Sequence, residues 1–175
     1  MKQTKALVFV YVVLLIFCVA FVLVTAQSLP LVVASHFDAA GHPNAHMPRD
    51  NYIALYLALL VLVPSCVAAL PWFISKIPMA YVNLPNRTYW LAPEKMAETK
   101  QVLQSYMSVL ASGLVCFMTG IHWLVLQAHQ NNSADISAQI PSHLLWLGTG
   151  LFVALTLLWS FRLNARFKQM PDSQT

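Results

Sequence analysis

The chain has 175 residues, of which 58% are hydrophobic and only 9% are charged, with a formal net charge of +4. A soluble domain is about 25% charged, so this composition excludes a water-exposed globule. It also excludes an intrinsically disordered chain and a disulfide-rich secreted module, and it indicates an integral membrane protein.

The first apolar stretch, from Ala6 to Ala26, contains no charged residue. It is long enough for a membrane-spanning helix, which needs about 20 mainly apolar residues. Because Lys2 and Lys5 precede it, a cleavable signal peptide is the alternative. The apolar run exceeds the usual signal-peptide core of about 7–15 residues, so we expect a retained anchor. Cleavage would leave three spans with the same sidedness of the loops.

The loop at 27–51 contains the sequence LPLVVASHFDAAGHP. Gly41 permits a left-handed turn, and Asp38 is suited to accept hydrogen bonds from the backbone ahead of it. His36 and Phe37 are suited to pack at the membrane interface. We expect an ordered turn that is anchored to the first span and directs its polar groups outward.

The second apolar stretch, from Tyr52 to Ile74, is also uncharged and predicts a second span. Pro64 lies inside it. An interior proline removes one helix hydrogen bond and clashes with the preceding turn, so we expect a kink near Pro64. We interpret this kink as ordinary membrane-helix irregularity in preference to a hinge or a cavity.

The loop at 75–105 contains the sequence NLPNRTYWLAPE. Pro93 suits the first position of a helix and Glu94 suits its first turn, which predicts a helix from about Pro93 that continues into the third span. Residues 83–90 are expected to form a hairpin-like segment at the interface. We favour a structural staple between the second and third spans over a cytoplasmic docking surface.

The third span, predicted at 106–128, combines small residues with one histidine. Ser105, Ser108 and Ser112 share a helical face, and small residues let helices approach closely in lipid. We therefore expect this helix to be central in the bundle. His122 is the strongest single functional candidate, because an ionisable group inside a span is costly and usually faces the bundle interior.

The fourth span, predicted at 144–161, is the shortest, with Trp146 and Trp159 near its ends. Nine of the ten basic residues lie at the two chain ends or in the loop at 75–105, and the exception is Arg49. Basic residues favour the cytoplasmic side. The sequence therefore predicts an all-α, four-helix membrane bundle, one domain over 1–175, with both termini cytoplasmic and the loops at 27–51 and 129–142 outside.

Cysteines and histidines raise the question of a metal site. Cys18, Cys66 and Cys116 lie in different spans, and we interpret them as small hydrophobic residues. All six histidines map to the outward half, and imidazole suits zinc, copper and nickel. Their spacing matches no HExxH-type motif, so a metal-binding protein is kept only as an alternative and no cofactor is expected. The histidines are His36, His42, His46, His122, His129 and His143.

The spans contain no Asp, Glu, Lys or Arg. Ion-coupled transporters and proton pumps carry such residues in the membrane, so this class is not expected. The sequence also lacks a phosphate-binding loop and a nucleophilic serine motif. We expect no enzymatic activity. No basic stripe indicates a nucleic-acid partner, and the lipid bilayer is the partner that the composition implies.

The two long loops carry a family resemblance. The first matches the pattern LP…HF[ND]xxGxP through Leu29, Pro30, His36, Phe37, Asp38, Gly41 and Pro43, although residues 44–49 depart from the aromatic and Gly-Ser-Lys-like turn that often follows. The second is similar to the pattern NxPNxxYWLxPE, which recurs after the second span of the family. Over about residues 29–98 the chain thus resembles domain-of-unknown-function family 1648, the amino-terminal domain of SdpI-type immunity proteins.

The resemblance implies a bacterial inner-membrane protein, and in the best-known member it implies protection against a secreted toxin and capture of a repressor at the membrane. Our first hypothesis is a non-enzymatic protein that binds a peptide toxin or protein partner through its outer loop. The alternatives are an accessory or sensor subunit that docks a cytoplasmic partner at Asn83–Glu98, and the metal-binding protein. The candidate functional residues are His36, Phe37, Asp38, Gly41, Pro43, Asn83, Pro85, Asn86, Trp90, Pro93, Glu94 and His122.

Overall fold

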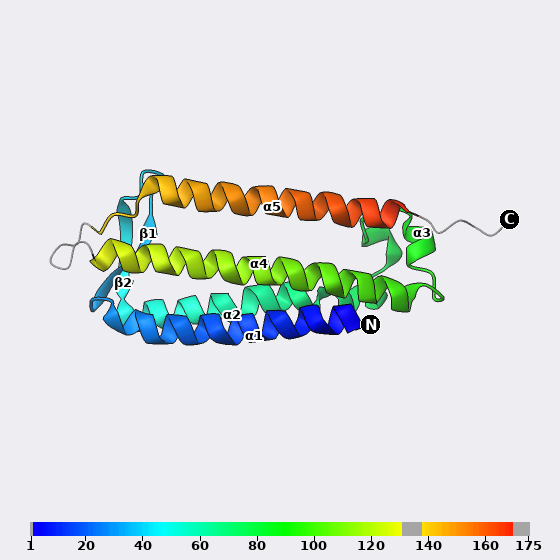
Figure 1. The fold of residues 1–175 in the computed structure, drawn as a ribbon, viewed down its shortest axis with the longest axis horizontal. Coiled ribbons are helices and arrows are strands. Elements are labelled where there is room, and N and C mark those ends of the chain that lie inside the picture. Colours follow the sequence, from blue (N-terminus) through cyan, green and yellow to red (C-terminus); the bar gives the residue numbers. More distant parts are fainter. Residues whose placement is uncertain (1, 131–137, 170–175) are drawn as a thin grey trace.

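The structure, a computed structural model, describes residues 2–130 and 138–169. Four long helices run side by side (Figure 1), and each is long and apolar enough to cross a membrane. They are α1 (Lys2–Thr25), α2 (Arg49–Phe73), α4 (Met96–Gln130) and α5 (Ser142–Lys168). The predicted all-α, four-helix membrane bundle is confirmed, and the chain is a multi-pass membrane protein.

The helices are longer than the predicted spans. α4 begins at Met96 and α5 ends at Lys168, whereas the predicted spans began at 106 and ended at 161. Hydropathy marks only the part of a helix that crosses hydrocarbon, and a helix continues beyond it into polar sequence. The start predicted at Pro93 is wrong by three residues, because Lys95 N donates to Ala92 O in a turn that precedes the helix.

Helix α4 is the central helix, as its small residues predicted. It packs against α1, α2 and α5, and it lies between α5 and the α1–α2 pair in Figure 1. Ala111 and Val115 are fully buried, and Ser108 is nearly so. Ser105 Oγ lies 2.9 Å from Thr4 Oγ1 of α1. The serine face therefore joins α4 to its neighbours by close packing and hydrogen bonds.

Helix α2 continues as one helix through Pro64 and Pro71, and both prolines are buried. Helices nearby supply hydrogen-bonding groups at this level of the bundle, where Tyr11 Oη lies 2.9 Å from Ser65 Oγ. Neighbouring helices commonly make prolines tolerable in membrane helices. The kink expected at Pro64 stays a prediction.

The loop at 27–51 contains a β-hairpin where we expected a simple turn. Strands β1 (Val32–Phe37) and β2 (Pro43–Pro48) pair antiparallel, with irregularities between Ala34 and His36 and between His36 and Phe37. Buried and exposed residues of β1 do not alternate cleanly, so the period-2 pattern that predicts a strand is absent from the sequence. A short 3₁₀ turn, η1 (Ala26–Ser28), links α1 to the hairpin.

The two ends of the bundle differ. The hairpin closes one end, and the start of α1 and the end of α5 lie at the other (Figure 1), as an even number of spans requires. The second end also contains the 3₁₀ turns η2 (Ile74–Lys76) and η3 (Met79–Tyr81) and the one-turn helix α3 (Arg87–Trp90). Following the predicted orientation, we name the hairpin end the outer end and the α3 end the inner end.

Candidate functional site

The turn between β1 and β2 is organised by Asp38. Its Oδ1 accepts hydrogen bonds from the backbone N–H groups of Ala40 and His42, both at 2.9 Å, and Asp38 N donates to His42 O. The hydrogen bond from the His42 backbone holds the pKa of the Asp38 carboxyl below its ordinary value. Asp38 therefore does what the sequence predicted, and its carboxylate is committed to shaping the turn.

Gly41 docks this turn onto the segment that leads into α5. Its φ is +85°, in the left-handed region that favours glycine, as predicted. Ile140 N donates to Gly41 O at 3.0 Å, and a Cβ on Gly41 would clash with Ile140 O. Trp146 Nε1 donates to Ala39 O at 3.0 Å. We name the hairpin together with residues 138–141 the outer cap.

The outer cap is also fixed to α1, α2 and α4. Ala34 N donates to His129 Nε2, and His129 Nδ1 lies 2.8 Å from Val125 O. Arg49 Nη1 donates to the carbonyls of Gln27 and Leu29. Hydrophobic packing beneath the hairpin completes the attachment. The buried residues there include Ala26, Leu29, Val33, Tyr52, Leu124 and Ile140, with Phe37 and Met47 packed against them.

The two motif residues that flank the turn have different environments. His36 is exposed, and its Nδ1 lies 3.2 Å from Ser35 Oγ. Pro43 is half-buried and pairs with Phe37 across the hairpin. Of the outer-loop motif, Asp38, Gly41 and Phe37 thus hold the cap together, whereas His36 is presented to the outside.

His122 lies in the bundle interior, as predicted, and is fully buried. Its Nε2 is 3.0 Å from Thr25 Oγ1, and its Nδ1 is 3.0 Å from Tyr52 Oη. Thr25 donates its own proton to Phe21 O, so it accepts from His122 Nε2–H, and Tyr52 donates to Nδ1. This assignment makes His122 a neutral imidazole that joins α1, α2 and α4.

Tyr56 completes the cluster around His122. Its hydroxyl donates to Met118 O, and its ring centroid lies 5.4 Å from the imidazole centroid. The Tyr52 ring lies 5.9 Å from the imidazole and the Phe21 ring lies 6.2 Å from it, so three aromatic rings contact the imidazole. Both ring nitrogens have partners, so the geometry supports a structural role for His122.

The outward histidines do not converge. His42 pairs with Asp38 at 3.7 Å and contacts Gln139, whereas His129 and His122 bind the partners given above. Within residues 2–130 and 138–169, no group of three His, Cys, Asp or Glu side chains is placed to hold a metal ion. The three thiols are free, with Cys18 buried and Cys66 and Cys116 exposed. The described geometry therefore gives the metal-binding alternative no support.

Side chains of the motif NLPNRTYWLAPE, at 83–94, bind the last backbone carbonyls of α5. Asn86 has a φ of +51°, and its Nδ2 donates to the carbonyls of Phe167 and Lys168. Trp90 Nε1 donates to Phe167 O at 2.8 Å, and Thr99 Oγ1 donates to Trp90 O. Side chains that bind the last carbonyls of a helix satisfy groups that have no partner inside it.

The hairpin-like staple predicted at 83–90 is therefore wrong. The segment contains a one-turn helix, and it ties the loop to the fourth long helix, where we expected a link between the second and third. Trp90 and Phe167 are both fully buried, with their rings edge-to-face at 5.3 Å. A single sequence does not reveal this pairing, because 77 residues separate the two partners. We name α3 with residues 83–86 and the end of α5 the inner cap.

Charged side chains surround the inner cap. Arg166 lies over the Trp90 ring at 5.0 Å and binds Glu98, which also binds Lys95. The Tyr89 hydroxyl and the Glu98 carboxylate hold the pKa of Lys95 above its ordinary value. The remaining residues of this motif are less buried than Trp90. Asn83, Pro93 and Glu94 are exposed, and Pro85 is half-buried.

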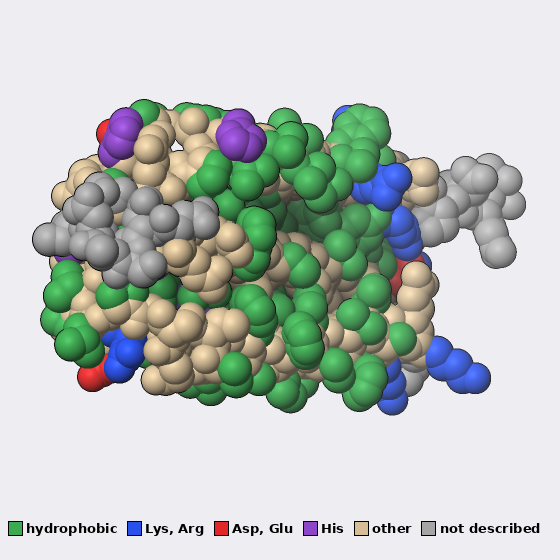
Figure 2. Space-filling view, turned by 60° about the vertical axis from the view of Figure 1, so that its left-hand side comes forward, with side chains coloured by type: hydrophobic (Ala, Val, Ile, Leu, Met, Phe, Trp, Pro, Cys, Tyr) green, Lys and Arg blue, Asp and Glu red, His purple; other side chains and the backbone are tan. Residues whose placement is uncertain are grey.

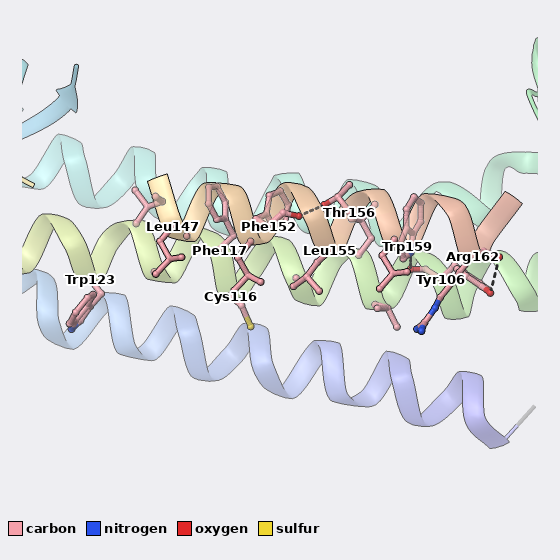
Figure 3. A pocket seen from close by; sticks show the side chains of 18 of the residues that line it. Tyr106, Cys116, Phe117, Trp123, Leu147, Phe152, Leu155, Thr156, Trp159 and Arg162 are labelled. Carbon is pink, nitrogen blue, oxygen red and sulfur yellow. Dashed lines mark hydrogen bonds between the residues drawn. The ribbon is translucent and has the colours of Figure 1, made fainter. Parts of the chain in front are cut away.

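A groove along α5 was not predicted from the sequence. It has a volume of about 1030 Å³, is lined almost wholly by apolar side chains of α4 and α5, and is bordered by Gln3 and Leu7 of α1. The structure shows Arg162 at one end and Trp123 at the other (Figure 3). It opens on the surface as a hollow among hydrophobic side chains (Figure 2). Its only sequence signal is an arginine directly after the fourth predicted span.

Comparison of the chain with protein-family models, with curated proteins and with solved structures gives no match. The function of the chain is therefore inferred from the described geometry and from the motif resemblance.

Proposed function

We propose that the chain is a non-enzymatic binding protein of the bacterial inner membrane, similar to the SdpI-type family, that protects the cell by binding a secreted peptide toxin at its outer end. One observation carries the proposal. The residues that resemble the family motif build a rigid outer cap, which is bonded to α4 and α5 and holds exposed side chains in fixed positions. Binding residues are commonly placed on loops that a rigid scaffold positions.

The cap provides both parts of a binding surface. Leu31 and Val32 are 77% and 56% exposed, and His36, on the same strand as Val32, is also exposed. A fixed surface loses little conformational entropy when a partner binds, which favours affinity. Exposed apolar and imidazole groups on one hairpin suit an amphipathic peptide, which reaches the outer surface without crossing the membrane.

The hydrogen bonds of Asp38 and His122 favour a structural role for both groups over a catalytic one. The Asp38 carboxylate accepts two backbone hydrogen bonds, and the imidazole of His122 is enclosed and fully bonded. A general acid or base must reach the proton that it transfers. The His122 imidazole is not presented to an outside ligand, and the exposed Asp38 carboxylate is engaged by the backbone of its own turn, which supports a protein that acts by holding its partner.

The proposal is tested by depletion of killing activity. Secreted peptide fractions of the source bacterium that kill a sensitive strain are incubated with nanodiscs that contain the chain, and the residual killing is measured. We expect the chain to deplete killing at least tenfold more than empty nanodiscs. The double variant Leu31→Ser with His36→Ala should lose this effect, and His143→Ala, which changes an exposed histidine at the start of α5, should keep it. Equal depletion by empty nanodiscs would refute the proposal.

A further inference from the structure

We propose that the groove along α5 is a binding site for an anionic phospholipid of the inner leaflet, with the phosphate at Arg162 and the acyl chains between α4, α5 and α1. This site lies away from the outer cap, and the inference does not depend on the proposed function. Three observations support it: the position of the groove, the distribution of polar groups in it, and the lack of an acidic partner for Arg162 among the described residues.

The groove exists because α5 packs against few neighbours. α5 contacts α4 along its length and is joined to the rest of the bundle at the two caps. None of the residues in its most apolar 18-residue window is buried. On α4, an added Cβ at Gly120 would meet nothing within 4 Å, and the same holds for Gly148 on α5. Small residues thus leave the groove open along its side, toward the bilayer.

The part of the groove between Phe152 and Arg162 matches the depth of one leaflet. Ten residues separate Phe152 from Arg162 on α5, which is about 15 Å at a rise of about 1.5 Å per residue. One leaflet contributes half of a hydrocarbon core about 30 Å thick. Phe117 stacks on Phe152 with ring centroids 4.5 Å apart, and the pair marks the depth that the ends of inner-leaflet chains would reach.

Polar groups gather at the inner end. Gln3, Ser105, Tyr106 and Arg162 line the groove there, whereas the opposite end is lined by Trp123, Leu144 and Leu147. Trp159 Nε1 donates to Tyr106 O at 2.8 Å, so the indole is fixed at the level where interfacial aromatics meet headgroups. The order of groups along the groove is that of a phospholipid: a charged head followed by apolar chains.

Arg162 provides charge complementarity. Its side chain extends from α5 toward α1 at the inner end of the groove (Figure 3), and basic side chains border this end of the hollow (Figure 2). The structure pairs Arg162 with no acidic side chain among residues 2–130 and 138–169, whereas the neighbouring Arg166 is bound to Glu98. A guanidinium forms two parallel hydrogen bonds with a phosphate, and basic pockets between spans on the cytoplasmic side bind anionic headgroups.

The test uses the full chain, delipidated in a mild detergent and examined by native mass spectrometry. The probes are dioleoyl phosphatidylglycerol and dioleoyl phosphatidylcholine, added at equal concentrations. We expect one phosphatidylglycerol to be retained at collision energies that strip phosphatidylcholine. Arg162→Gln should lower this retention at least tenfold. Arg87→Gln, which removes an exposed inner-end charge outside the groove, should leave it unchanged.

A second variant tests the apolar part of the site. Val109 lines the groove and is 48% exposed, so Val109→Trp places bulk in the space proposed for the acyl chains and leaves Arg162 in place. It should lower phosphatidylglycerol retention at an unchanged melting temperature. Equal retention of both lipids, retention unaffected by Arg162→Gln, or a dimer or a co-purified peptide in the groove that excludes phosphatidylglycerol would each overturn the proposal.

Discussion

Trp90 Nε1 donates a hydrogen bond of 2.8 Å to the backbone oxygen of Phe167, and both side chains are fully buried. This contact joins the loop after α2 to the last turn of α5, whose main helix neighbour is α4. The inner cap therefore holds the carboxyl end of α5 against the bundle.

Trp90→Phe should destabilise the protein by about 1 kcal/mol, because it removes one buried hydrogen bond and keeps most of the aromatic packing. The thermal melting temperature in detergent is the measurement. Trp72→Phe is the matched control, since it removes an exposed indole hydrogen bond to Gln104 and should shift the melting temperature less. A larger effect at Trp72 would show that the inner cap does not limit stability.

Asn86 should tolerate Gly better than Ala. Its positive φ costs a residue with a Cβ about 1–2 kcal/mol, and its side chain also binds two carbonyls of α5. Asn86→Gly removes only the hydrogen bonds, whereas Asn86→Ala removes them and adds backbone strain. Melting temperatures should therefore fall in the order wild type, Gly, Ala. Equal values for Gly and Ala would mean that the left-handed backbone is not retained.

Gly41→Ala should loosen the outer cap. The added Cβ meets Ile140 O, and the positive φ adds about 1–2 kcal/mol of strain. Proteolysis within residues 27–48 should become at least several-fold faster, while α4 and α5 stay protected. Gly120→Ala, at a site where a Cβ meets nothing within 4 Å, is the control and should cleave at the wild-type rate. An unchanged rate in Gly41→Ala would argue against the docking of the turn on Ile140.

His122→Leu should cost more than Tyr52→Phe. The leucine leaves the buried hydroxyl of Tyr52 without its partner, at about 1–3 kcal/mol for an unsatisfied group, and it also removes the hydrogen bond to Thr25, which keeps its bond to Phe21 O. The phenylalanine removes one donor. Chemical denaturation measures both. A double-mutant cycle between the two positions should give a coupling energy clearly above zero, and additive effects would contradict the contact.

The hairpin should loosen in acid. The pKa of Asp38 is lowered in the folded protein, chiefly by the hydrogen bond from the His42 backbone. Its stabilising effect is therefore fully present above the ordinary pKa of 3.8 and is lost as pH falls through the lower folded-state pKa. Amide exchange at Ala40 and His42 should accelerate below pH 3.8, after correction for intrinsic rates. Asp38→Asn should lack this acceleration, and a variant that keeps it would assign the effect to another group.

The global fold can be predicted from hydropathy and residue spacing, whereas the long-range contacts of the two caps cannot. Long uncharged stretches predict the helices, and the serine spacing on α4 predicts its central place. The turn chemistry of Asp38 and Gly41 is local, so it was also predictable. By contrast, Gly41 contacts Ile140 about a hundred residues later in the chain, and Trp90 contacts Phe167 after 77 residues. Such contacts have no local signature in one sequence.

The groove could not be predicted for a related reason. It results from the distance between α5 and α1, which depends on how the two caps hold the ends of α5. Gly120 and Gly148 read in the sequence as ordinary small residues of membrane helices. Only the folded chain brings them, with Phe117 and Arg162, into the lining of one groove.

The central claim is that the outer cap protects the cell by binding a secreted peptide. The most direct measurement is the survival of a sensitive strain exposed to the killing peptide fraction while it expresses the chain. The account predicts at least tenfold higher survival with the wild type and with His143→Ala than with an empty vector. It also predicts vector-level survival with the Leu31→Ser, His36→Ala double variant at equal membrane abundance. Survival with the double variant that equals the wild type would contradict the claim.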